Sequence, residues 1–151
     1  MLFQTINPGD AETGFATMRN GEGATLPEGG LVQYDTATTQ DGRYFRQLDS
    51  GLLWAVCGAL HASCASDSTT NILVQVFGYD DDVLFFQTDT SIAAGQPLIA
   101  VAAVNYCNTA VTTTASNAAV TQQPFFGVLA ESVATSSASA IRATKVFLRC
   151  M

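Results

Sequence analysis

The last stretch of the chain, Pro124–Cys150, restricts the fold more than any other part of the sequence. Two apolar runs, Phe125–Val133 and Ile141–Leu148, flank a segment of small, mostly polar residues at 135–139, which predicts a strand, a loop and a strand. Alternate residues of the second run form two faces: Ile141, Ala143, Lys145 and Phe147 on one, Arg142, Thr144, Val146 and Leu148 on the other. Each face is mostly apolar and carries a charge near one end, so we expect this strand to lie in a core with its ends in solvent.

A similar pattern occurs earlier in the chain. Residues 58–72 match residues 127–141 at a constant offset of 69 positions, with Gly-Ala-Leu at the start of one and Gly-Val-Leu at the start of the other. A loop of small residues follows in both, and each unit has an apolar segment upstream, at 27–32 and 93–99. Because Ala, Gly, Leu and Val are common residues, the match fits either two copies of one β unit or a chance likeness.

The rest of the chain is also predicted to be all-β. No window carries apolar residues at the i, i+3, i+4, i+7 spacing over a helical length, whereas short apolar runs alternate with Gly, Asn, Asp and Ser. With 151 residues, 48% of them hydrophobic, the chain is long enough to bury a core as one domain without disulfides. We therefore expect a single-domain β-barrel or β-sandwich of about eight to ten short antiparallel strands, in two quasi-repeated halves if the repeat is real.

Turn signals place several strand ends. Asp41–Gly42 separates the runs Leu31–Thr36 and Arg43–Leu48, and this dipeptide favours a hairpin because both positions tolerate positive φ. Three consecutive acidic residues, Asp80–Asp82, follow the run Asn71–Tyr79. We expect them to form a solvated turn before the next strand.

The first part of the chain is expected to differ from the rest. Residues 1–26 contain Asn-Pro-Gly and Asn-Gly turn signals, and their apolar residues are too scattered for a helix or a strand. We therefore expect an extended N-terminal arm at 1–26 and a β domain at 27–151. The arm is either a frayed terminus or a segment that orders against a partner, and in the second case its anchors are Leu2, Phe3, Ile6 and Phe15.

Few residues have the types and spacing that catalysis or metal binding needs. Cys57, His61 and Cys64 have zinc-ligand types, but a structural zinc site needs a fourth ligand, so core thiols are the simpler interpretation. The aspartates at 80–82 lack the spacing of a calcium loop. His61 is the single histidine and no Gly-x-Ser-x-Gly motif is present, so a hydrolase would have to use it without that framework. We predict no catalytic residues, no metal site and no cofactor.

Charge and hydropathy exclude several classes of partner. The formal net charge is −7 and the chain has one lysine and no basic cluster, so binding to nucleic acid through phosphate contacts is not expected. No segment approaches the roughly 18 apolar residues of a membrane span, and the first residues do not have the form of a signal peptide. We expect synthesis in the cytoplasm, no membrane partner, and free buried thiols at Cys57, Cys64, Cys107 and Cys150.

Adjacent aromatic residues indicate a surface that binds a partner. Neighbours on a strand point to opposite faces, so the pairs Phe85–Phe86 and Phe125–Phe126 are each expected to bury one ring and expose the other. We assign Phe85, Phe86, Phe125 and Phe126 to a subunit or partner interface. More apolar surface than one small barrel can cover favours self-association, and closed symmetry, most simply a trimer, would cover it.

The segments Ile72–Tyr79, Ala93–Gly95, Phe126–Glu131 and Lys145–Arg149 resemble the capsid decoration (cement) proteins of tailed bacteriophages. The likeness covers most of residues 27–151 and consists of strand segments joined by loops rich in Ala, Ser and Thr. It implies a β-barrel or β-sandwich on the outer surface of the virion, often a trimer, that bridges neighbouring subunits of the major capsid protein and has no catalytic residues. The alternative is a carbohydrate-binding or adhesin module, such as a head fibre or a receptor-binding tip.

Overall fold

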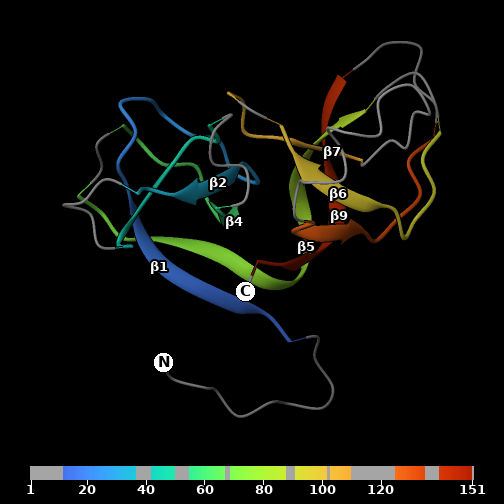
Figure 1. The fold of residues 1–151 in the computed structure, drawn as a ribbon, viewed down its shortest axis with the longest axis horizontal. Coiled ribbons are helices and arrows are strands. Elements are labelled where there is room, and N and C mark those ends of the chain that lie inside the picture. The colour runs from blue at the N-terminus through green and yellow to red at the C-terminus, as the bar shows by residue number, and fades with distance from the viewer. Residues whose placement is uncertain are drawn as a thin grey trace.

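Nine β-strands form one sheet in the computed structural model, which describes residues 12–36, 42–49, 55–66, 69–87, 91–101, 103–109, 125–134 and 140–150 (Figure 1). The strands are β1 (Gly14–Asn20), β2 (Leu31–Tyr34), β3 (Tyr44–Arg46), β4 (Val56–Leu60), β5 (Ile72–Gln87), β6 (Pro97–Ala100), β7 (Cys107–Thr109), β8 (Gly127–Leu129) and β9 (Ala140–Arg149). None of the described residues lies in an α-helix, so the predicted all-β class is confirmed.

Hydrogen bonding closes the sheet into two rings. β1, β3, β2, β4 and β5 are neighbours in that order, and β1 pairs again with β5. β5, β7, β6, β8 and β9 are neighbours in the same way, and β9 pairs again with β5. The 16-residue β5 therefore belongs to both rings, which we call ring 1 and ring 2. Figure 1 shows two lobes side by side, with β2 and β4 in one, β6 and β7 in the other, and β5 running along the base.

The two rings repeat one register of strand pairing. The first two strands of each order, β1 with β3 and β5 with β7, are parallel. Paired Cα positions in ring 1 have equivalents in ring 2. The pair Leu31–Ala59 corresponds to Pro97–Val128, the pair Ala59–Gln75 to Val128–Phe147, and the pair Tyr34–Phe45 to Ala100–Cys107. The isolated bridges agree as well, Leu26–Cys64 with Ile92–Val133. The internal repeat that the sequence left open is therefore present in the fold.

Both copies of the repeat have a glycine where two strands come close. A Cβ at Gly58 would overlap the carbonyl oxygen of Gln75 on β5, and a Cβ at Gly127 would lie 2.6 Å from the carbonyl oxygen of Phe147 on β9. Any larger residue would push these strands apart, because the obstacle is main chain and not a flexible side chain. This constraint explains why Gly-Ala-Leu and Gly-Val-Leu are the clearest part of the repeat in the sequence.

Each ring has its own core, and ring 1 also contributes to the core of ring 2. The core of ring 1 consists of Met18, Leu26, Val32, Phe45, Cys57, Leu60, Cys64 and Val74. The larger core of ring 2 includes four residues from the ring 1 half of the chain, Leu31, Leu48, Val56 and Ala59. β4 is buried along its whole length, because Cys57 and Leu60 face the interior of ring 1 while Val56 and Ala59 pack on ring 2.

The expected arm at 1–26 differs from the structure in its second part. Gly14–Asn20 forms β1, which pairs antiparallel with β5, and Leu26 is buried in the core of ring 1. The inward side of β1 carries Ala16, Met18 and Asn20. Because Ala16 is small and Asn20 is polar, the alternation of apolar and polar residues that indicates a strand is too weak to be recognised in the sequence. Leu2, Phe3 and Ile6 lie outside the described residues.

Asp80–Asp82 does not separate two strands, contrary to the expected turn. β5 runs through these residues, and its pairing with β9 shifts there, from Asp80–Val146 to Val83–Thr144. The Asp82 amide donates a hydrogen bond to Asp80 Oδ1 at 2.9 Å. A local side-chain acceptor stabilises a β-bulge as well as a turn, since both bend the backbone over a few residues. The bulge lets one long strand serve both rings.

Candidate docking surfaces

One face of β5 carries exposed aromatic side chains. Alternation along the strand places Leu73, Phe77 and Tyr79 opposite Val74, which belongs to the core of ring 1. Phe77 and Tyr79 both meet Phe147 of β9 edge to face, with ring centroids 5.3 and 5.0 Å apart. Tyr79 is 47% exposed and Leu73 is 44% exposed, so this cluster faces solvent.

An ion pair borders this cluster. Lys145 Nζ lies 3.2 Å from Asp81 Oδ1 and 5.7 Å from the centroid of the Tyr79 ring. Both charged side chains are well exposed, so solvent screens the ion pair and it contributes little to stability. The ion pair instead determines where Lys145 lies, because Asp81 and the Tyr79 ring together hold its side chain beside the apolar cluster.

The same face continues onto β1. Phe15 is 43% exposed and meets the His61 ring edge to face, with centroids 5.3 Å apart. Thr17, two residues along β1, pairs with Leu73 of β5, so the two strands present one continuous surface. We call Phe15, Leu73, Phe77, Tyr79 and Phe147 the outer layer. Figure 1 shows the strands β1 and β5 together at the base of the molecule, where most of this layer lies.

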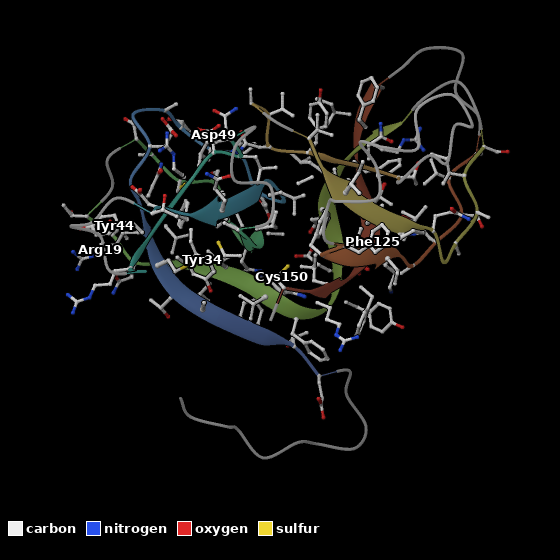
Figure 2. The ribbon with its side chains drawn as sticks, viewed as in Figure 1. Arg19, Tyr34, Tyr44, Asp49, Phe125 and Cys150 are labelled. Carbon is white, nitrogen blue, oxygen red and sulfur yellow. The ribbon has the colours of Figure 1, made fainter. Side chains whose placement is uncertain are left out.

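A second apolar surface lies on ring 2. Pro97 and Ile99 of β6 alternate with the buried Leu98 and Ala100, and therefore point away from the core. Phe125, just before β8, is 57% exposed and Val128 of β8 is 38% exposed. Figure 2 shows Phe125 on the lobe that contains β6 and β9. We call Pro97, Ile99, Phe125 and Val128 the β6–β8 face. Val128 pairs with Phe147, so this face adjoins the outer layer.

The paired phenylalanines lie on opposite sides of their strands, and two of them need correction as interface residues. Phe85 is 0% exposed and Phe126 is 4% exposed, and both belong to the core of ring 2. Phe125 is exposed, and Phe86 is partly exposed and stacks on Tyr106 with centroids 5.4 Å apart. Phe85 and Phe126 therefore stabilise the fold of the chain itself, while Phe86, Phe125 and Phe15 remain available to a partner.

Sequence reasoning missed most of both surfaces. Leu73, Tyr79 and Phe147 lie within runs that are apolar on both faces, and the sequence alone gave no means of deciding which face is covered. A signal was present, because a small ring has one interior and cannot bury both faces of every strand. Applied to 72–79, that limit would have marked one of the two sets of alternate residues as surface.

The cysteines are free thiols in apolar surroundings. Cys57, Cys64 and Cys107 are buried, and burial raises their pKa values; burial also raises the pKa of Cys150 to about 12. Such thiols are poor nucleophiles at neutral pH. Cys57 and Cys64 face the core of ring 1 while His61 is exposed, and within the described ranges no three His, Cys, Asp or Glu side chains come together as metal ligands.

The structure defines a duplicated all-β protein with two adjoining apolar surfaces. No protein-family model matches the chain, and no curated protein matches it. Among the residues that the structure describes, none forms a helix long and apolar enough to cross a bilayer.

Proposed function

We propose that this chain is a structural virion protein that binds the outer surface of an assembled phage capsid. Bound there as a homo-oligomer, most simply a trimer, it bridges neighbouring major capsid subunits and stabilises the shell. The observation that carries the proposal is the outer layer, which sets five apolar side chains on one side of the molecule. The resemblance of the sequence to decoration proteins supplies the class of partner.

Contact with a shell protein would remove the outer layer from water. Single exposed apolar residues are ordinary, but a contiguous group with a polar rim is typical of interaction sites. Truncating a central aromatic residue in such a site costs about 2 kcal/mol or more of binding free energy. Tyr79 and Phe147 have the central position, since Phe77, Val128 and Lys145 surround them.

The N-terminal arm adds to this contact. β1 begins at Gly14, so the residues that precede it join the molecule at the outer layer. An extended segment can add a strand to an exposed sheet edge of a partner, with alternate side chains such as Leu2, Phe3 and Ile6 entering pockets. Ordering the segment offsets part of the gain, so the arm contributes several kcal/mol at most.

Binding to undecorated shells tests the proposal. Shells assembled from the major capsid protein of the same phage are incubated with the purified protein, and the bound copies are counted after sedimentation. Tyr79→Ala should weaken shell binding by about 30-fold, which corresponds to about 2 kcal/mol. Tyr34→Ala is the matched control, because Tyr34 is also a strand tyrosine, 37% exposed, and lies outside the outer layer. Wild-type protein that fails to bind shells, or equal losses in the two variants, would contradict the proposal.

A carbohydrate-binding or adhesin module is the second candidate. It is favoured by exposed aromatic rings beside the Lys145–Asp81 pair, since sugars stack on aromatic faces and hydrogen-bond to neighbouring charges. The ring planes are steeply inclined, however: Phe147 makes angles of 75° with Phe77 and 65° with Tyr79, so the rings do not form one flat platform. Specific glycan binding by the isolated protein, lost in Tyr79→Ala, would support this candidate over capsid binding.

We further propose that the chain is not an enzyme. His61 is exposed and its ring contacts Phe15, which places it at the edge of the outer layer. His61→Ala should therefore change shell binding slightly and no chemical activity. A hydrolase activity of the purified protein that disappears in His61→Ala would overturn this part of the proposal.

A further inference from the structure

The internal repeat identifies what the β6–β8 face corresponds to. Strand register matches Pro97, Ile99 and Val128 of this face with Leu31, Gln33 and Ala59 of ring 1. The offset of 69 positions that relates Ala59 to Val128 also relates Val56 to Phe125, the fourth residue of the face. The four ring 1 residues are at most 9% exposed, and Leu31, Val56 and Ala59 belong to the core of ring 2. The β6–β8 face is therefore the copy, on ring 2, of the surface that ring 1 buries against its neighbouring ring.

The backbone around the two surfaces shows the same difference in covering. On the ring 1 side, Leu31 N donates to Asn105 O at 2.9 Å, and Leu84 N donates to Gly29 O at 2.9 Å. A Cβ at Gly29 would overlap the carbonyl oxygen of Asp82. On the ring 2 side the glycine of the equivalent turn is Gly95, where a Cβ would meet nothing within 4 Å among the described atoms. We call these main-chain contacts between residues 29–31 and ring 2 the joint. The joint covers this surface of ring 1, and it has no counterpart on ring 2 in the described part of the chain.

The side chains of the β6–β8 face are nevertheless those of a buried surface. Ile99 occupies the place of Gln33, Phe125 that of Val56, and Val128 that of Ala59, so the exposed copy is more apolar and bulkier than the buried one. A surface that faces water gains nothing from such residues, whereas one that packs on a partner does. This composition indicates that the face is covered in the functional state.

Charge indicates the covering partner. β9 adjoins the face and carries Arg142, Lys145 and Arg149, three of the six basic residues of the chain, and no acidic residue; of these, Lys145 is paired with Asp81 of β5. Residues 1–71, which contain β1–β4, have eight acidic and three basic residues, a net charge of −5 out of −7 for the whole chain. A second copy thus offers an acidic half to the basic strand beside the β6–β8 face.

We infer that the β6–β8 face binds the ring 1 half of a second copy of this chain, head to tail. The internal joint is not reproduced in detail, because Pro97 replaces Leu31 and lacks the N–H that Leu31 donates to Asn105. The contact between copies is therefore one of packed side chains with a rim of opposite charges. This contact supplies the self-association of the proposed function and does not require the capsid, although the β6–β8 face adjoins the outer layer where Val128 pairs with Phe147.

Sedimentation velocity of the full chain tests this inference. The wild type should associate with concentration up to about 100 μM, a range in which interfaces of modest affinity are populated. Phe125→Glu should weaken association by at least about tenfold with unchanged circular dichroism and melting temperature, because it places a charge in the contact and alters no core residue. Ile141→Glu is the matched control, since Ile141 is 52% exposed and lies outside the face. A monomeric wild type, or full association of Phe125→Glu, would overturn the inference.

A mixing experiment tests the head-to-tail geometry. Fluorescent Phe125→Glu protein keeps an intact ring 1 half, so it should still bind to the β6–β8 face of unlabelled wild type. In a symmetric face-to-face dimer both partners need the face, and the labelled variant would not bind; that result would refute the geometry proposed here. Shell binding is measured separately with Tyr79→Ala, so loss of the capsid proposal and loss of this inference give different results.

Discussion

Replacing Gly29 with alanine, with Gly95→Ala as the matched control, tests how the two rings are joined. The two glycines hold equivalent places in the repeat and have similar backbone angles, with φ of 69° and 86°. They differ in surroundings: a Cβ at Gly95 meets no described atom within 4 Å, while a Cβ at Gly29 overlaps the carbonyl oxygen of Asp82 in the bulge of β5. The loss of stability in Gly95→Ala therefore measures backbone strain alone. The loss in Gly29→Ala measures the same strain and, in addition, the disruption of the contact between the two rings.

The expected losses can be worked out from these contacts. Alanine in the left-handed region costs about 1–2 kcal/mol, which is the whole effect expected for Gly95→Ala. At Gly29 the methyl group must also displace the bulge, an overpacking cost of about 1–3 kcal/mol. The Leu84 N–Gly29 O hydrogen bond is then weakened, which removes about another 1 kcal/mol. Gly29→Ala should thus destabilise the protein by about 3–6 kcal/mol, and by about 2–4 kcal/mol more than the control.

Urea denaturation of both variants measures the difference, with an unchanged m-value as evidence that the same surface is exposed on unfolding. In a chain of this size each kcal/mol corresponds to a shift of about 2–4 °C in melting temperature, so thermal unfolding should also separate the two variants. Equal destabilisation by Gly29→Ala and Gly95→Ala would refute the reasoning, because it would mean that the 28–30 turn does not pack against β5.

Three further predictions concern the core, the thiols and cooperativity. Phe85→Ala should lower the free energy of unfolding by about 3–5 kcal/mol because the ring is fully buried, whereas Phe86→Ala should cost less than about 2 kcal/mol; urea denaturation measures both. Burial raises the pKa values of Cys57 and Cys107 above the unfolded value of 9.0, so the stability they contribute is complete below that pH and falls above it by about 1.4 kcal/mol per pH unit for each thiol. Urea denaturation at about pH 8 and about pH 10 should show this loss, and Cys107→Ala should make it smaller. Heat should unfold both rings in one transition, because β5 and Ala59 serve both; two resolved calorimetric transitions would contradict this.

Alternation in the sequence predicted the strands that face one core. In β9, alternation separates a buried set, Thr144, Val146 and Leu148, from Lys145 and Phe147, which are partly exposed, and residues 140–143 and Arg149 at the ends are exposed. Only one face of this strand lies in a core, so the expectation that the strand would be enclosed apart from its ends was wrong. The expected hairpin is confirmed by the antiparallel pairing of β2 with β3, and Gly42 has the positive φ, 68°, that its turn signal implied, while Asp41 lies outside the described residues. These features depend on residues close together in the sequence, so a local pattern is enough to reveal them.

Strands that face two cores could not be predicted in the same way. β4 has no polar side because its outward residues, Val56 and Ala59, pack on ring 2. Whether an outward side chain is covered depends on a strand far away in the chain, and the local pattern carries no information on that. The bulge at Asp80–Asp82 is a similar case, since an acidic triplet predicts a bend in the backbone but not whether the strand continues beyond it.

The candidate docking surfaces could not be recognised from the sequence, because the two copies of the repeat differ in which residues another ring covers. Equivalent residues are 66 positions apart for Leu31 and Pro97, 69 for Ala59 and Val128, and 72 for Gln75 and Phe147, so no single offset aligns the two copies. The copies agree where the backbone leaves no room, as at the two close glycines, and differ where one copy is covered by the next ring and the other is not. An apolar residue in the last copy thus has the same sequence signature as a core residue. The closure of both rings shows that Phe125 and Val128 occupy positions equivalent to buried residues of ring 1. Among the described residues, no further ring of the same chain covers them.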